Sequence, residues 1–229
     1  MDIDYMDGFR VFTFNSSRFP DPKGLTEKLK RQNVKPVTII DPGVKIDAGY
    51  SVYDEGMDQG HFARNPDGTV YEGEVWPGPA VFPDFTQEKT RLWWGEKARI
   101  MTDAGIRGIW NDMNEPANFS GQLPGDLRFS AGTHDEIHNV YGHLMAKATY
   151  DGLLKADGRR PFVLTRACCA GSQRFCSGWT GDNHSLWAHI QLSLTQMMNL
   201  GLSGMYMVGA DVGGFGSDVT PELLIRWFQ

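Results

Sequence analysis

Two short segments of this 229-residue chain place carboxylates where they could take part in catalysis. Residues 106–116 begin with apolar residues and then turn abruptly polar around Asp112. Residues 177–183 repeat the pattern and end near Asp182. A carboxylate at the end of a buried strand costs free energy unless it is hydrogen-bonded or used in chemistry. Both aspartates are therefore candidate catalytic residues.

A pair of carboxyl groups can hydrolyse a glycosidic bond, one acting as nucleophile or base and the other as proton donor. Asp112 fits the nucleophile, because the amides of Asn111 and Asn114 could donate hydrogen bonds that keep it ionised. Asp182 lies near a bulky tryptophan, a setting that favours the protonated carboxyl that an acid catalyst needs. Taken alone, Asp182 could equally be the N-cap of the helix expected at 185–200.

Strand-like apolar runs alternate with helical patterns along the chain, which predicts a parallel sheet with helices outside it. Strands are expected at 35–40, 108–110, 161–165, 177–180 and 204–208, with residues 2–6 as the end of a sixth. Helices are expected at 24–32, 87–104, 136–155, 185–200 and 221–229. Polar residues follow each expected strand, a layout typical of a (β/α)8 barrel, whose active site lies at that face. The prediction is an α/β fold, an incomplete (β/α)8 TIM barrel with about six of its eight strands.

The composition narrows the domain organisation and the partners. Residues 1–229 are expected to form one partial catalytic barrel, in which 43–86 is a long loop excursion. A net charge of −6 with scattered basic residues argues against nucleic-acid or membrane partners, and no apolar run reaches transmembrane length. Three closely spaced cysteines lack a metal-binding pattern, so we expect no metal, no cofactor and a reducing, cytoplasmic location.

At this point a family resemblance accounts for both segments. Gly108–Glu115 and Trp179–Asn183 resemble the nucleophile and acid/base signatures of the α-glucosidases of glycoside hydrolase family 31. The similarity runs in order along essentially the whole chain and includes Asp2–Met6, Ile40–Gly43, Gly73–Asp84, Pro161–Gly178 and Gly209–Phe215. It implies a retaining, exo-acting enzyme that hydrolyses terminal α-linked glucose from oligosaccharides by double displacement. Asp112 would form the covalent intermediate, and Asp182 would act first as acid and then as base.

Further positions match the sugar site of that family. Asp2 and Asp211 resemble the carboxylates that bind the hydroxyls of the terminal glucose, and Arg166 resembles the arginine that holds the same ring. The apolar walls implied by the resemblance are Trp76, Trp110, Met113, Trp179 and Phe215. Without the resemblance, Met113 and Phe215 would be read as core residues. The flanking β-domains of the family are not found here, so we expect a barrel fragment that is inactive or nearly so by itself.

Several alternatives stay open on the residues alone. Asp2, Asp4 and Asp7 form a D-x-D-x-x-D run that could bind Mg²⁺ or Mn²⁺, as in a sugar-nucleotide transferase, although no phosphate-binding glycine loop accompanies it. A non-catalytic sugar-binding protein is disfavoured because both catalytic carboxylates are present. Within the family, α-glucan lyases and transglycosylases share the nucleophile. An oligosaccharide is the expected partner, and the sequence does not indicate an oligomeric state.

Overall fold

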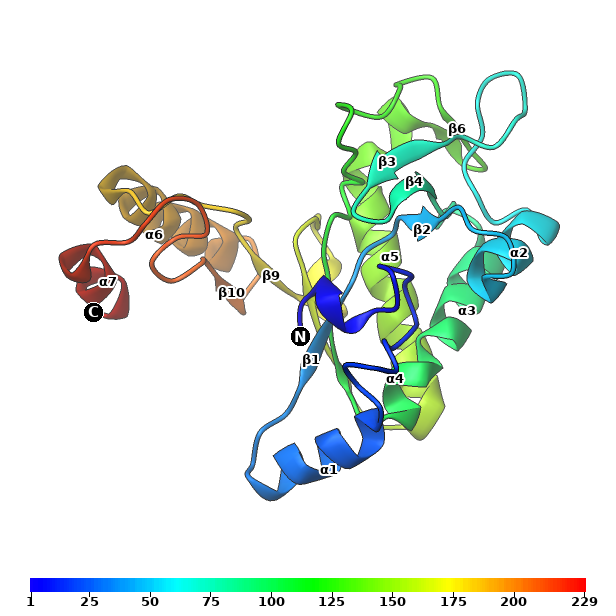
Figure 1. The fold of residues 1–229 in the computed structure, drawn as a ribbon. Coiled ribbons are helices and arrows are strands. Elements are labelled where there is room, and N and C mark those ends of the chain that lie inside the picture. Colours follow the sequence, from blue (N-terminus) through cyan, green and yellow to red (C-terminus); the bar gives the residue numbers. More distant parts are fainter.

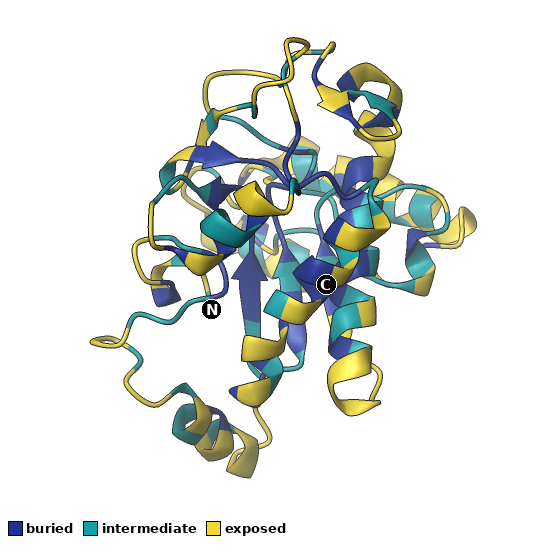
Figure 2. Cartoon of the chain, turned by 90° about the vertical axis from the view of Figure 1, so that its right-hand side faces the viewer, coloured by how far each residue is buried: buried dark blue, intermediate teal, exposed yellow.

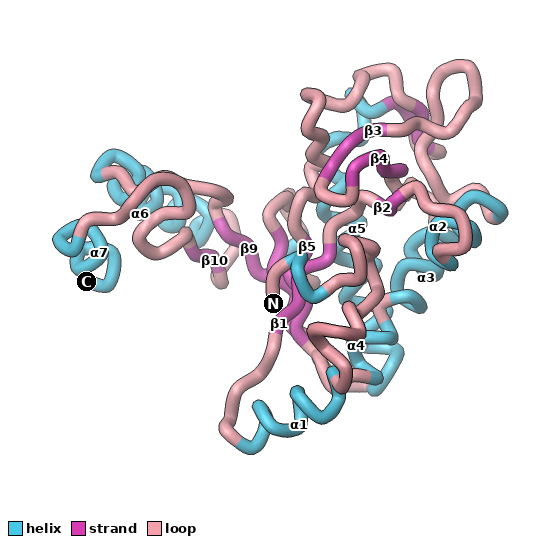
Figure 3. The backbone as a smooth tube through the Cα atoms, in the orientation of Figure 1, coloured by secondary structure: helices cyan, strands magenta, loops and turns pink.

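The centre of the structure is a parallel β-sheet. The computed structural model describes residues 1–229, and its largest sheet has the strand order β1-β5-β8-β9-β10, with all neighbours parallel. These five strands are Val37–Ile40 (β1), Gly108–Asn111 (β5), Phe162–Thr165 (β8), Ser177–Trp179 (β9) and Val208–Gly209 (β10). The predicted α/β class and parallel sheet are confirmed. Figure 3 shows that the strands form an open sheet and not a closed barrel.

α-Helices precede, connect and follow the strands of this sheet, except that β8 and β9 are joined without one. They are Pro22–Arg31 (α1), Glu88–Lys97 (α3), Arg99–Asp103 (α4), His134–Asp157 (α5), Trp187–Leu202 (α6) and Pro221–Phe228 (α7). In Figure 1, α3, α4 and α5 lie together in one body, whereas α6 and α7 extend away from it beyond β9 and β10. None of the helices has the length and apolar character that crossing a membrane requires.

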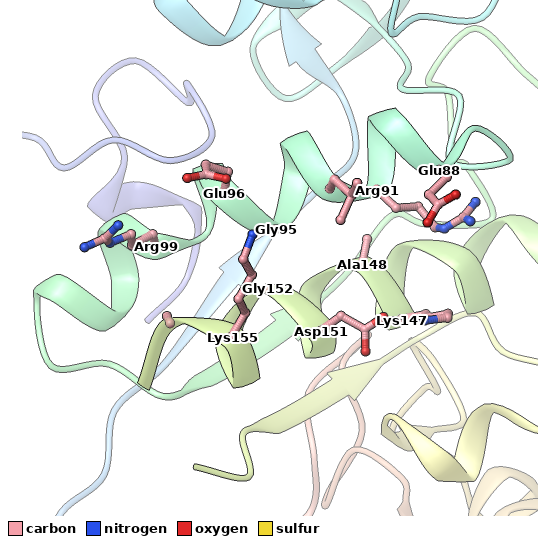
Figure 4. Close-up of a pocket in the computed structure, with 12 residues that line it drawn as sticks. Glu88, Arg91, Gly95, Glu96, Arg99, Lys147, Ala148, Asp151, Gly152 and Lys155 are labelled. Atoms are coloured by element: carbon pink, nitrogen blue, oxygen red, sulfur yellow. Dashed lines mark hydrogen bonds and ion pairs between the residues drawn. The ribbon is translucent and has the colours of Figure 1, made fainter. Parts of the chain in front are cut away.

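The helices α3 and α5 pack with their backbones almost in contact. Glycines allow this approach, because a Cβ atom on Gly95 would lie 2.9 Å from the Cα atom of Gly152. Beside this crossing, charged side chains such as Arg91, Lys147 and Asp151 line a groove (Figure 4). None of the residues that line this groove belongs to the predicted site, so we assign it to helix packing.

Residues 43–86 contain a helix and a small antiparallel sheet of their own. The helix is Ser51–Asp58 (α2), and the sheet has the order β2-β4-β3, formed by Val44–Lys45 (β2), Gly73–Val75 (β3) and Gly78–Val81 (β4). A hairpin of Arg128–Phe129 (β6) and Gly132–Thr133 (β7) follows β5. Asp84 connects the 43–86 segment to this hairpin, because its Oδ2 atom accepts a hydrogen bond from the backbone N–H of Ser130 (2.8 Å). Together they form an ordered layer at the carboxyl ends of β1 and β5 (Figure 1).

The apolar core lies in the first two thirds of the chain. Its largest fully buried side chain, Trp94, packs edge-on against Phe12 and Phe85, with ring centroids 4.7 Å and 5.1 Å away. The main cluster of buried apolar residues contains none after Val163. In the last third, large apolar side chains are exposed, among them Leu192, Leu194, Met198, Leu202, Ile225 and Phe228. Figure 2 shows how the buried residues gather around the sheet.

The expected sixth strand, residues 2–6, is wrong. Ile3–Tyr5 form a 3-10 helix (η1), because Asp2 Oδ1 accepts a hydrogen bond from the N–H of Ile3 (2.7 Å) and so favours a turn over an extended chain. Met1, directly before this segment, lies beside β1, where its carbonyl accepts a hydrogen bond from the N–H of Ile39 (3.0 Å).

The strand expected at 204–208 is also shorter than predicted. Gly204 adopts a left-handed conformation (φ 90°) after α6, and the chain joins the sheet only at β10. Tyr206 and Met207 are 70% and 52% exposed, so the apolar run that suggested a buried strand is largely at the surface. The sheet therefore has five strands and not about six.

Candidate active site

Arg166 lies between the two candidate catalytic carboxylates. Asp112, Arg166 and Asp182 follow β5, β8 and β9, so their side chains come from the carboxyl ends of neighbouring strands. One guanidinium nitrogen, Nη1, is 3.1 Å from Asp112 Oδ1 and 3.4 Å from Asp182 Oδ2. The structure therefore brings these three predicted site residues together around one positive charge.

Asp112 is a buried carboxyl group with a pKa close to neutral. The residue is 8% exposed, and burial raises its pKa to about 6. The guanidinium of Arg166 and the backbone N–H of Met113 lower this pKa, whereas the charges of Asp182 and Glu115 raise it. Met113 has a left-handed backbone (φ 54°), a conformation that costs a non-glycine residue about 1–2 kcal/mol. The chain thus keeps a strained residue directly after the carboxyl group that its N–H helps to ionise.

The asparagines beside Asp112 do not hold its carboxylate, so this part of the prediction is wrong. The Nδ2 atom of Asn114 donates to Thr165 Oγ1 (2.8 Å), and its Oδ1 atom accepts the N–H of Ala167 (3.0 Å). Asn111 is fully buried, and its side chain makes no hydrogen bond within the chain. Asn114 therefore joins the loops after β5 and β8, and Arg166 takes the role expected of the amides.

Asp182 is more exposed than the sequence suggested. Its side chain is 50% exposed, and the ring of Trp179 packs edge-on against Trp110, with the ring centroids 5.7 Å apart. The side chain of Asn183 holds the backbone of Asp211, which follows β10, through two hydrogen bonds. Its Oδ1 atom accepts the N–H of Asp211 (2.9 Å), and its Nδ2 atom donates to the Asp211 carbonyl (3.1 Å). Burial raises the pKa of Asp211, and the charge of Asp182 adds to this effect. Asp211 therefore lies near enough to Asp182 for the two charges to interact.

The remaining predicted apolar residues differ in their surroundings. Met113 is buried, and its Sδ atom lies 3.3 Å from Arg166 Nη2. Trp76 lies between β3 and β4 and packs edge-on against Phe119 (5.0 Å), with 48% of Trp76 and 51% of Phe119 exposed. Phe215 follows β10 and is 71% exposed. Both Trp76 and Phe215 thus keep much of their apolar surface open to solvent.

The aspartates near the start of the chain do not converge on a common point. Asp4 contacts Arg18 (3.5 Å) and Asp7 contacts Arg10 (3.4 Å), while Asp2 accepts a backbone hydrogen bond. Residues 1–229 contain no group of three or more side chains arranged to hold a metal ion. This arrangement gives no support to a metal-dependent transferase.

Two acidic residues of the site were not among the predicted site residues. Glu115 forms a two-point ion pair with Arg166, through Oε1 to Nε (2.7 Å) and Oε2 to Nη2 (2.9 Å). Asp41 follows β1 next to Asp112, since Ile40 pairs with Asn111 in the sheet. The sequence could have indicated Asp41 as a site residue in the same way as Asp112, because both directly follow a predicted strand.

Asp41 is buried without a compensating hydrogen bond. It is 5% exposed, and its Oδ1 atom has no partner within the chain. Burial and, after it, the charge of Asp112 raise its pKa to about 8, although the positive charge of Arg166 opposes both effects. A raised pKa means that the folded chain holds a proton that the unfolded chain releases. Asp41 therefore lowers the free energy of unfolding progressively as the pH rises from about 4 to about 8.

The Asp41→Asn variant is expected to be more stable than the wild type at pH 8, by a few kcal/mol at about 1.4 kcal/mol per pKa unit. The advantage should be smaller at pH 5, because at that pH the cost of keeping Asp41 protonated in the folded chain has accumulated over only about one pH unit above its unfolded pKa. Urea unfolding at both values measures it, with the exposed Asp58→Asn as control. If the free energy of unfolding of Asp41→Asn and of Asp58→Asn changed equally between pH 5 and pH 8, burial of Asp41 would not be the cause of the cost.

Comparison with known proteins finds a family that matches the whole chain. The model of the "Glycosyl hydrolases family 31 TIM-barrel domain" matches residues 1–229. The chain is 51% identical to Alpha-glucosidase 2 of Bacillus thermoamyloliquefaciens and 43% identical to human Neutral alpha-glucosidase AB, covering 100% of this chain in both cases. It spans 30% and 25% of the lengths of these two relatives.

Solved structures give the same picture. The crystal structure of a glucosidase II alpha subunit in a Glc1Man2-bound form superposes with a TM-score of 0.94 at 37% identity, covering 100% of this chain and 26% of that one. A Flavobacterium johnsoniae GH31 dextranase complexed with glucose superposes with a TM-score of 0.88 at 28% identity, covering 99% of this chain and 30% of that one.

Proposed function

Because the chain belongs to glycosyl hydrolase family 31, we propose that it carries the catalytic centre of a retaining, exo-acting α-glucosidase. The substrate would be an oligosaccharide with a terminal α-linked glucose, as the names of the α-glucosidase relatives suggest. Asp112 would be the nucleophile that forms a covalent glucosyl-enzyme, and Asp182 would act as acid in the first step and as base in the second.

The shared contact with Arg166 Nη1 is the observation that carries the retaining mechanism. Two oxygens that lie 3.1 Å and 3.4 Å from one nitrogen cannot be farther apart than the sum of these distances. In inverting enzymes the two carboxyl groups are roughly 6.5–9.5 Å apart, because a water molecule must fit between them. The largest possible distance between the oxygens of Asp112 and Asp182 only equals the lower end of this range. The arrangement therefore favours direct attack by Asp112.

The environment of Asp112 also suits a nucleophile. With a pKa of about 6, most of this carboxyl group is ionised at pH 7. We place the terminal glucose beside it, with Asp2, Arg166 and Asp211 toward its hydroxyls and with the rings of Trp76, Trp110, Trp179 and Phe215 as apolar walls. A site closed at one end by such groups would release glucose units from chain ends.

We further propose that the site works within a longer polypeptide. The main sheet is open, and the chain spans only 25–30% of the α-glucosidases that it resembles. Additional β/α units would cover the exposed apolar side chains of α6 and α7 and complete the pocket. Activity is therefore expected from the full-length protein.

The test follows, by NMR, the anomer that the full-length protein first releases from maltose and isomaltose. Initial release of α-glucose, with later mutarotation to the β form, is the expected result. Initial β-glucose would overturn retention, and an unsaturated sugar product would identify a lyase instead. Longer oligosaccharides as the main products would identify a transglycosylase.

A further inference from the structure

Every side-chain nitrogen of Arg166 has its own set of partners. Nε and Nη2 donate to the two carboxylate oxygens of Glu115 (2.7 Å and 2.9 Å), and Nη2 also contacts Met113 Sδ (3.3 Å). Nη1 remains for Asp112 and Asp182. A two-point pair with a carboxylate fixes the plane of a guanidinium group, which a single contact cannot do. The orientation of Nη1 is therefore set by Glu115.

Double displacement moves one negative charge between the two carboxylates that Nη1 contacts. In the first step an oxygen of Asp112 bonds to the anomeric carbon, and the bond from that carbon to the glycosidic oxygen breaks. The leaving oxygen keeps the electron pair and takes the proton of Asp182. Asp112 is then a neutral ester, and Asp182 carries the charge.

The second step returns the charge to its origin. A water oxygen bonds to the anomeric carbon and gives its proton to Asp182, while the electron pair of the ester bond goes back to Asp112. The site thus has the same total charge throughout, but the position of the charge alternates. A cation that serves both steps has to stabilise two positions.

We propose that Glu115 is a positioning residue that keeps Arg166 stationary, so that Nη1 acts as a shared cation for Asp112 and Asp182 in turn. This inference rests on the function proposed above. An arginine side chain without the Glu115 contact could follow the charge, and its movement would add reorganisation to each step. A fixed guanidinium avoids that cost, because it already lies within 3.4 Å of both carboxylates.

The surrounding charges determine the expected pH behaviour. Asp112 is influenced by Arg166, Asp182 and Glu115, and Asp41 faces it from the end of β1. Asp2 adds a further negative charge near Asp41. Since Glu115 raises the pKa of Asp112, its neutral replacement should lower that pKa. The acidic limb of the kcat/KM profile, which reports the free enzyme, should then move to lower pH.

The experiment compares wild type, Glu115→Gln and the exposed control Glu74→Gln in the full-length protein. In Glu115→Gln we expect kcat to fall about 10–100-fold with a smaller change in KM, because a misplaced group of this kind costs up to about 10²-fold. A fluorinated glucosyl fluoride separates the steps: both formation and hydrolysis of its adduct on Asp112 should slow. Glu74→Gln should match the wild type.

The outcomes separate this inference from the proposed function. A wild type that is not labelled at Asp112 would overturn both the function and the positioning role. Labelling of the wild type together with wild-type rates and an unshifted pH limb in Glu115→Gln would overturn the positioning role alone. If Glu115→Gln fails to fold, Glu115→Asp serves instead: it keeps the charge but shortens the reach, so slow steps without a pH shift are expected, and wild-type rates would count against the proposal.

Discussion

Replacement of Asp112 by alanine in the full-length protein is expected to reduce hydrolysis of maltose by about 10⁴-fold or more. Losses of about 10⁴–10⁶ follow when a residue of the group that forms and breaks a covalent intermediate is removed. Asp112 is suited to that role because it is buried, next to Arg166 (3.1 Å), and titrates with a pKa of about 6. Steady-state rates with maltose measure the effect.

Azide distinguishes the roles of the two carboxylates. In Asp112→Ala, azide can occupy the space of the missing carboxylate and attack the anomeric carbon directly, so the product should be β-glucosyl azide. In Asp182→Ala the covalent intermediate still forms from a substrate with an activated leaving group, and azide then attacks it to give the α anomer. The opposite pattern would exchange the assigned roles, and full activity of Asp112→Ala would refute the mechanism.

The local pattern of the sequence was sufficient for the strands that carry the site. The runs expected at 108–110, 161–165 and 177–180 became β5, β8 and β9, and each of these strands has buried positions. Residues 2–6 failed as a strand, since a local hydrogen bond to Asp2 outweighed the extended conformation.

The surroundings of the carboxylates could not be predicted in the same way. Glu115 and Arg166 are 51 residues apart, and no local pattern indicates that they pair. Asn114 and Thr165 are also 51 residues apart, so no local pattern predicted their hydrogen bond. Because the Asn114 amide donates to Thr165, it does not donate to Asp112 as expected. Burial also decides which carboxyl group has the raised pKa, and burial depends on packing between distant segments. The sequence therefore predicted which residues gather but not how their charges are balanced.

Replacement of Arg166 by glutamine is expected to lower the free energy of unfolding at pH 7 by about 3–5 kcal/mol, as for other buried pairs that lose one partner. Arg166 is 14% exposed and contacts three carboxylates, Asp112, Glu115 and Asp182. Burial lowers its pKa, but the hydrogen bonds to Glu115 and the three negative charges raise it overall. The guanidinium is therefore charged at every pH at which the chain folds, and its loss leaves buried negative charge uncompensated.

The sign of the pH dependence follows from Asp112. Arg166 lowers the pKa of Asp112, so its removal raises that pKa above about 6. When the pKa of a carboxyl group is higher in the folded than in the unfolded chain, the free energy of unfolding falls as the pH rises from the unfolded to the folded pKa. The deficit of Arg166→Gln should thus be smaller at pH 5 than at pH 8, as measured by urea unfolding at both values.

A double variant separates lost charge balance from lost packing. Arg166→Gln with Asp112→Asn removes a positive and a negative charge together, so it should recover much of the stability at pH 8. The control Arg107→Gln breaks the pair with Asp157 (2.7 Å), and Asp112→Asn should not rescue it. If Asp112→Asn fails to rescue Arg166→Gln, the arginine stabilises the chain through packing, and its charge is not what holds the carboxylates in place.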